Sequence, residues 1–347
     1  MTETEFRIEP IPSTVATATT TAQTPAAKPA PARRIVCWAT IAAVLPYLCL
    51  KLCWLSGSTI GLTRPQAAED STLSALNTLT LAMDSVAALV ALALTYRWGR
   101  RVPAWMLVAP MWVASGFLGT AVLVVPLQLG VDAATGSSFS APNGFLAPWV
   151  YLVVYSGFML QGLGLLVAFA FYSRARWPAL SARSVTRSGV PRPLCVALAF
   201  LAALTAAPEL YWAVGGTAGL PAREAAAGDV NGIVLRAALA AAALAAAAGV
   251  TELRRSRSVG AIWTPLVAVW LGSAALFAWG TWTALVDATA SLLNGDTHSG
   301  LTAELVTGTV QAVAGAALAL AALAALRRRA GAATEAVATA AALSRSA

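Results

Sequence analysis

Histidine and charged side chains are scarce in this chain of 347 residues. His298 is the single histidine, and Asp, Glu, Lys and Arg together make up 11% of the sequence. Soluble domains carry roughly a quarter charged residues, so the composition excludes a water-soluble globule. Because no cysteines, histidines and carboxylates cluster at the spacing of metal ligands, we expect no metal and no other cofactor.

Motifs of known enzymes are also missing. The sequence contains no GxxxxGK[ST], HExxH, GxSxG or Rossmann pattern. Its four cysteines, Cys37, Cys49, Cys53 and Cys195, contain no CxxC pair and are expected to be small buried apolar residues. An enzyme is therefore the less favoured class, and an intramembrane enzyme acting on a lipid-like substrate is only a third hypothesis.

Apolar residues, in contrast, are abundant: 58% of the chain is hydrophobic and the mean hydropathy is +0.71. Several apolar runs are long enough to cross a hydrocarbon core of about 30 Å as a helix. The fold class predicted from these runs is an all-α, polytopic membrane helical bundle of eight transmembrane helices. The predicted spans are 35–56, 74–96, 102–127, 147–172, 194–214, 232–253, 260–285 and 303–326.

Arginine clusters lie before the first predicted span and after the second, fourth, sixth and eighth, and thus all on one side of the membrane. Cytoplasmic loops retain positive charge, so both termini are predicted to be cytoplasmic in a multi-pass protein of the plasma (inner) membrane. The clusters are Arg33 and Arg34, then Arg97, Arg100 and Arg101, then Arg174 to Arg192, then Arg254, Arg255 and Arg257, and finally Arg327 to Arg329. These arginines lie at helix ends and not in one stripe, which argues against nucleic-acid binding. Membrane lipids are the expected partners, and other membrane proteins stay open.

The chain matches itself at an offset of 158 residues. Six spaced coincidences carry the match: Cys37/Cys195, Trp54/Trp212, Arg97/Arg255, Trp105/Trp263, Trp112/Trp270 and Ser115/Ser273. The sequence therefore predicts two four-helix repeats, 34–173 and 194–329, joined by an Arg-rich cytoplasmic linker at 174–193. Segment 1–33 is predicted to be a disordered tail, and the Ala-rich tail 330–347 to be either a frayed helix or disordered.

Each predicted repeat has an even number of spans, so both would have the same orientation in the membrane. Such parallel repeats are related by a pseudo-two-fold axis along the membrane normal, as in some transporters. The boundary between the repeats is then the natural place for a cavity. Two bundles that only pack together would have the same pattern, so the repeat does not by itself establish transport.

The clearest repeated block is L-x-W-x-x-G-x-T-x-G-L, at 52–62 and 210–220. Its tryptophan is expected to anchor a helix end at the membrane interface, and its glycines to end the helix and form a turn. With the wider stretches PYLCLKLCWLSGSTIGL and PELYWAVGGTAGL, the chain resembles multi-pass membrane proteins of high-GC actinobacteria that have no assigned activity. This resemblance implies a plasma-membrane location and nothing about mechanism.

Four charged residues lie well inside the predicted spans, away from their ends, where each costs a few kcal/mol unless it is partnered. Their depths suggest two ion pairs, Lys51 with Asp84 and Glu209 with Arg236. Such pairs are explained if each charge only neutralises its partner for the sake of the structure. The functional alternative is a proton- or ion-coupled relay centred on Asp84. All four are therefore candidate ligand-binding residues.

A second candidate group lies at mid-depth in the third and seventh spans. It consists of Trp112 and Ser115 in one span and of Trp270 and Ser273 in the other, with Trp105 and Trp263 expected on the same faces. Helix packing with the indole N–H bonded to a serine or carbonyl explains them, and a pocket for an apolar, planar or cationic ligand is the alternative. Pro46, Pro110, Pro208 and Pro265 are expected to interrupt the odd-numbered spans.

The leading functional hypothesis is a small-molecule or ion permease, or a binding component, with its site between the repeats. The alternative is a non-transporting membrane scaffold or partner subunit. The two hypotheses differ in whether the candidate residues converge on a water-accessible cavity or lie in separate, dry helix contacts.

The topology predicts the side on which the loop after the fourth span lies. An epitope tag placed just beyond Arg187 is expected to be shielded in intact cells and to be labelled after permeabilisation, because this loop is predicted to be cytoplasmic. Antibody labelling with and without permeabilisation measures this. A tag reached from outside would overturn the orientation of both repeats.

Overall fold

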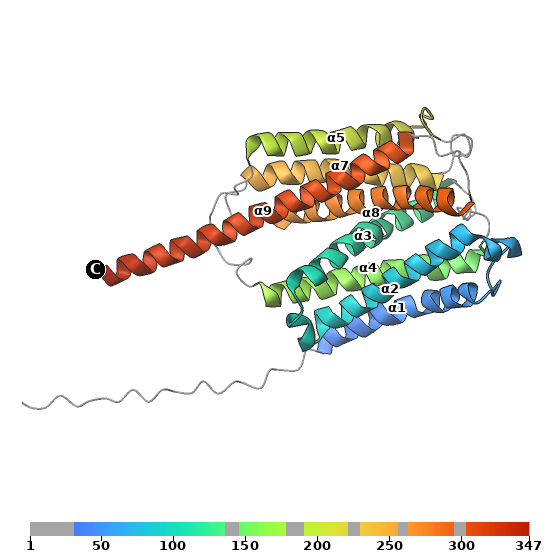
Figure 1. Cartoon of the computed structure of the whole chain (residues 1–347), viewed down its shortest axis with the longest axis horizontal. Coiled ribbons are helices and arrows are strands. Elements are labelled where there is room, and N and C mark those ends of the chain that lie inside the picture. The colour runs from blue at the N-terminus through green and yellow to red at the C-terminus, as the bar shows by residue number, and fades with distance from the viewer. Residues whose placement is uncertain are drawn as a thin grey trace, which may run out of the picture.

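The computed structural model describes residues 31–135, 146–177, 191–220, 230–255, 263–294 and 303–346. In these ranges the fold is an all-α bundle of eight long helices, all of them long and apolar enough to span a membrane (Figure 1). The helices are α1 Pro31–Leu55, α2 Ser71–Thr95, α3 Ala104–Thr135, α4 Pro148–Arg176, α5 Arg192–Ala213, α7 Val230–Arg255, α8 Trp263–Asn294 and α9 Ala303–Ser346. The chain is thus an integral membrane protein.

The eight predicted spans correspond one to one to these helices, but several helices are longer than predicted. The third predicted span ends at 127 and α3 continues to Thr135; the seventh ends at 285 and α8 continues to Asn294. Hydropathy marks where a helix leaves the apolar layer, whereas the backbone stays helical until a glycine, a proline or a cap stops it. Part of the tail predicted from 330 onward belongs to α9, and α1 already begins at Pro31, inside the segment predicted to be disordered. Residues 1–30 and His298 lie outside the described ranges.

Local sequence explains several helix ends. The Asp70 side chain caps α2 by accepting hydrogen bonds from the backbone N–H groups of Thr72 and Leu73. Pro148 begins α4 at a position where a missing N–H costs nothing. Pro265 lies in the first turn of α8 for the same reason, so the expectation that it interrupts a span was wrong. Pro46, Pro110 and Pro208 do lie inside their helices.

The same turn follows α1 and α5. Gly57 and Gly215 have φ angles of 87° and 94°, and Gly61 and Gly219 have 75° and 83°. This left-handed backbone region strongly favours glycine. The prediction that these glycines end the helix and form a turn is confirmed at both places.

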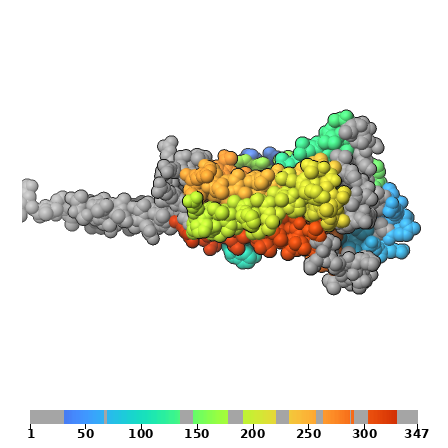
Figure 2. Space-filling view, turned by 90° about the horizontal axis from the view of Figure 1, so that it is seen from above, coloured from blue at the N-terminus to red at the C-terminus, as the bar shows by residue number. Residues whose placement is uncertain are grey.

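Each half of the bundle has its own core. In the first half, α1 packs on α2 and α4, and α3 packs on α4; in the second half, α7 lies between α5 and α8, and α9 packs along α8. Figure 2 shows α5, α7 and α9 side by side on one face of the molecule. The N-terminal end of α1 and the C-terminal end of α9 lie at the same end of the bundle (Figure 1).

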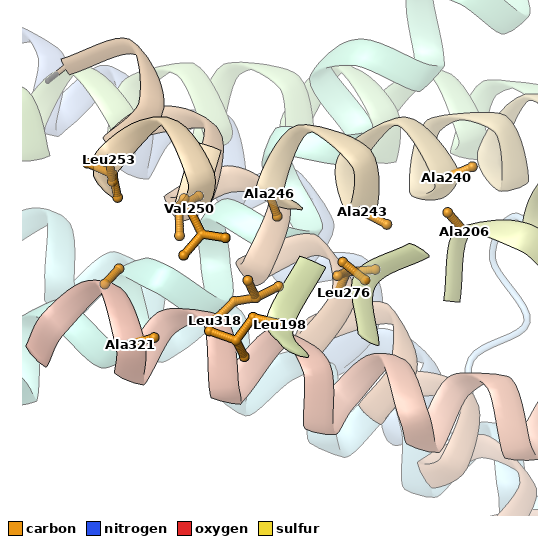
Figure 3. Close-up of a cluster of buried hydrophobic side chains, with 13 residues drawn as sticks. Leu198, Ala206, Ala240, Ala243, Ala246, Val250, Leu253, Leu276, Leu318 and Ala321 are labelled. Atoms are coloured by element: carbon orange, nitrogen blue, oxygen red, sulfur yellow. The ribbon is translucent and has the colours of Figure 1, made fainter. Parts of the chain in front are cut away.

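The core of the second half consists largely of alanine. Seven of the thirteen residues in its buried cluster are alanines, against three of ten in the first half. Figure 3 shows these short side chains between α5, α7, α8 and α9. Small residues let helix backbones approach closely, which is the main source of packing energy between helices in lipid.

The two halves meet mainly where α3 crosses α8, with further contacts from α3 to α7 and from α2 to α8. Gly116 of α3 lies against the backbone of α8, so that a Cβ at this position would overlap the carbonyl group of Ala274 and lie 2.8 Å from the Cβ of Ala278. At Gly119, one turn further along α3, a Cβ would meet only Leu271, at an ordinary contact distance of 3.7 Å.

The crossing predicts different effects of alanine at these two glycines. Gly116→Ala is expected to destabilise the protein by about 1–3 kcal/mol, because the added methyl group must push two backbones apart. Gly119→Ala is the matched control, since both changes add the same helix propensity and only Gly116 is crowded. Thermal unfolding in detergent, followed by tryptophan fluorescence, compares the two. Equal stability would show that the backbones are not in contact at Gly116.

Candidate functional site

The first pair of buried charges links α1 to α2. Lys51 is completely buried, and its Nζ lies 2.6 Å from Oδ2 of Asp84, which is 7% exposed. The same ammonium group lies 4.0 Å from the centre of the Tyr47 ring, in cation–π geometry. The predicted pairing of Lys51 with Asp84 is confirmed, and it contains one positive and one negative charge.

The second pair is part of a larger network. Arg236 of α7 lies 3.7 Å from Oε2 of Glu209 of α5, which confirms the predicted pairing. The closer partner of Arg236 is Glu304 of α9, at 2.9 Å. Gln311 of α9 donates a hydrogen bond of 2.7 Å to Oε1 of Glu209. Three helices are therefore connected by four polar side chains.

Sequence reasoning missed the roles of Glu304 and Gln311. Neither residue belongs to the candidate groups that the sequence predicts. The two residues are seven apart, which places them on one face of a helix two turns apart. That spacing was the available signal, and α9 uses it to present both side chains to the Glu209 and Arg236 pair.

The tryptophan of the repeated block has a different role from the predicted one. Trp54 and Trp212 are only 9% and 4% exposed, so they do not anchor the helix end in the membrane interface. Each indole N–H donates to a carbonyl six residues later, at Ile60 (2.8 Å) and Ala218 (3.0 Å). The rings thus hold the glycine turns against the helix ends. Trp212 also has the guanidinium of Arg236 over its ring, at 4.7 Å.

The mid-depth tryptophans and serines connect the two halves reciprocally. The Trp112 N–H donates to the Ser273 hydroxyl, and the Trp270 N–H donates to the Ser115 hydroxyl, each at 3.1 Å. Both serines are buried, at 3% and 0% exposed. The packing interpretation of these four residues is confirmed, and both indole N–H groups already have partners.

The rest of the predicted aromatic stripe does not join this contact. Trp105 is 70% exposed and Trp263 is 40% exposed, so neither takes part in the buried contact, although their spacing places them on the same helix faces. The rings that do pack on the central tryptophans are Phe277, 4.8 Å from Trp112, and Phe169, stacked on Trp270 at 5.4 Å. Position in the bilayer explains the difference, because an indole near a helix end can face lipid and interface together.

The candidate residues form three separate groups. Lys51 and Asp84 lie between α1 and α2, Glu209 and Arg236 between α5, α7 and α9, and the tryptophan and serine residues at the crossing of α3 and α8. A shallow groove on the outer face of α5, lined by Arg192, Pro193, Val196, Ala197 and Phe200, contains none of them. Within the described ranges, no three His, Cys, Asp or Glu side chains are placed to hold a metal ion.

Comparisons of the chain with protein-family models, with curated proteins and with solved structures found no match. The function is therefore inferred from the geometry of these three groups.

The buried Lys51 and Asp84 pair predicts non-additive effects of alanine substitution. Lys51→Ala or Asp84→Ala alone leaves an unpaired charge inside the membrane, at a cost of about 3–5 kcal/mol, whereas the double change removes both charges. Each single variant is expected to accumulate in the membrane less than the double variant does, as measured by quantitative immunoblotting of membrane fractions. Leu52→Ala, at a 56% exposed position on the same helix, is the control. Losses that simply add would count against the pairing.

Proposed function

We propose that the chain is a non-transporting scaffold or partner subunit of the plasma membrane, built from two four-helix repeats of the same orientation. The observation that carries this proposal is the reciprocal Trp112–Ser273 and Trp270–Ser115 contact. It occupies the place between the halves where a permease of this architecture would have its substrate site. The polar groups there bond to each other, and Gly116 packs backbone against backbone beside them.

Equivalent contacts at the offset of 158 residues support the repeat. The turns after α1 and α5 share their positive-φ glycines and their tryptophan-to-carbonyl hydrogen bonds, at positions that differ by 158 in every case. The Trp and Ser bonds exchange partners between the halves, as a pseudo-two-fold axis through the α3 and α8 crossing would require.

The arginine distribution supports the cytoplasmic orientation of both termini. The last turns of α4 and α7 contain Arg174, Arg176, Arg254 and Arg255. These helix ends lie at the same end of the bundle as the start of α1 and the end of α9 (Figure 1). Positive charge at this end favours the cytoplasmic side and attracts anionic lipid headgroups.

The length of α9 supports the partner-subunit proposal. This helix runs from Ala303 to Ser346, and its apolar span ends at Arg328. The remaining turns extend past the ends of the neighbouring helices (Figure 1), over about 27 Å at 1.5 Å per residue. Isolated helices of this length are only marginally stable in water, so a binding partner would stabilise this extension.

The second candidate function is a small-molecule or ion permease or binding component. One observation favours it: Oε2 of Glu209 is buried and accepts no hydrogen bond from the described residues. This would move the site from the boundary between the halves into the second half, between α5, α7 and α9.

Cysteine accessibility distinguishes the two candidates. In a variant without the four native cysteines, Ser115→Cys and Ser273→Cys are expected to react with a membrane-impermeant maleimide from neither side, because the scaffold proposal requires a dry contact there. Ser56→Cys, at an exposed position after α1, is the positive control and should react from one side. Labelling of either central cysteine would show that water reaches the contact between the halves, and would favour the permease.

A further inference from the structure

We propose that Glu209 is a proton-binding site inside the membrane, and that its carboxylate takes up a proton to become a neutral carboxylic acid while Arg236 stays paired with Glu304. This inference does not depend on whether the chain is a scaffold or a permease. It rests on the arrangement of charges around Glu209.

The geometry divides the two carboxylates into a strong and a weak partner of one guanidinium. Glu304 lies 2.9 Å from Arg236 and forms a hydrogen bond, whereas Glu209 lies 3.7 Å away, beyond hydrogen-bonding distance. The side chain of Glu304 is 24% exposed and that of Glu209 is 7% exposed. The more deeply buried carboxylate therefore has the weaker contact with the positive charge.

The two oxygens of Glu209 differ in the same way. Oε1 accepts the hydrogen bond from Gln311 at 2.7 Å, while Oε2 is buried and accepts none from the described residues. An ionised carboxylate has about four acceptor sites and is costly to bury with so few of them used. A proton on Oε2 removes the charge and leaves the Gln311 hydrogen bond to Oε1 intact.

The charged groups around Glu209 come from each helix that packs on α5. The described contacts are Arg236 from α7 and the neutral Gln311 from α9, with Glu304 of α9 on the far side of the guanidinium. On α5 itself, the other charged residue is Arg192, at the opposite end. The described residues of this network thus contain two carboxylates and one cation.

The contrast with the first half identifies the ligand as a proton. Lys51 and Asp84 are one ammonium and one carboxylate at 2.6 Å, so that pair is neutral when both groups are charged. In the second half, Glu209 is a buried carboxylate whose cation lies beyond hydrogen-bonding distance, and a proton on Oε2 neutralises it. A metal cation would need the space between the two carboxylates, and the guanidinium of Arg236 already occupies it.

Infrared difference spectroscopy of the full chain in lipid nanodiscs tests the proposal. Lowering the pH is expected to produce the carbonyl stretching band of a buried carboxylic acid, and Glu209→Gln is expected to abolish it. Glu69→Gln, at an exposed position outside the spans, should leave the band unchanged. Absence of the band at every pH, or its persistence in Glu209→Gln, would overturn the proposal.

A second variant keeps the test decisive if Glu209→Gln does not fold. Glu304→Gln removes the competing carboxylate, which leaves Glu209 as the anionic partner of Arg236 among the described residues. The band is then expected to appear only about one pH unit or more lower than in the unmodified chain, because the nearby negative charge that favours protonation is gone. An unchanged titration midpoint in Glu304→Gln would show that Glu209 does not bind the proton within this network.

Discussion

The absence of water from the hydrocarbon core is the constraint on which the structure depends, because every polar group inside it needs a partner within the protein. Lys51 meets this requirement with Asp84, Trp112 with Ser273, and Trp270 with Ser115. Each of these contacts joins two helices, so the polar residues also decide which helices are neighbours. In a bundle held by small residues and dispersion forces, such contacts add specificity to packing that is otherwise permissive.

Residues with few possible partners were predictable from sequence. Lys51 and Asp84 are charges at compatible depths on consecutive antiparallel helices, so their pairing followed from topology and cost alone. The ion pair of Glu304 with Arg236 could not be predicted from depth alone. A carboxylate at the start of a helix can equally well face water, and only the position of the neighbouring helix distinguishes the two cases. Trp105 and Trp112 are two turns apart on one helix, yet only Trp112 is used between helices. Periodicity gives a face of the helix, whereas the crossing of α3 and α8 decides how much of that face is buried.

The two halves partner their buried charges with different residues. Position 51 of α1 holds a lysine and position 209 of α5, 158 residues later, holds a glutamate, so the buried charges on these two helices have opposite signs. The first half uses a larger variety of side chains in its core, and the second uses mainly alanine. In the second half α9 packs against α5, and Gln311 and Glu304 enter the charge network from α9. The additional carboxylate of this network is thus supplied by α9.

The path from Glu209 to the boundary between the halves is short and consists of direct contacts. Gln311 bonds to Glu209, and Gly315, one turn further along α9, lies so close to α8 that a Cβ there would be 2.5 Å from the Ser273 carbonyl oxygen. The hydroxyl group of the same serine accepts the Trp112 hydrogen bond from the other half. A movement of α9 toward α8 would therefore press on the α8 backbone at Ser273. Because the backbones touch without intervening side chains, there is little freedom to absorb such a movement locally. The dry contact between the halves and the charged network of the second half are thus linked through the close packing of α9 on α8, although no side chain belongs to both groups.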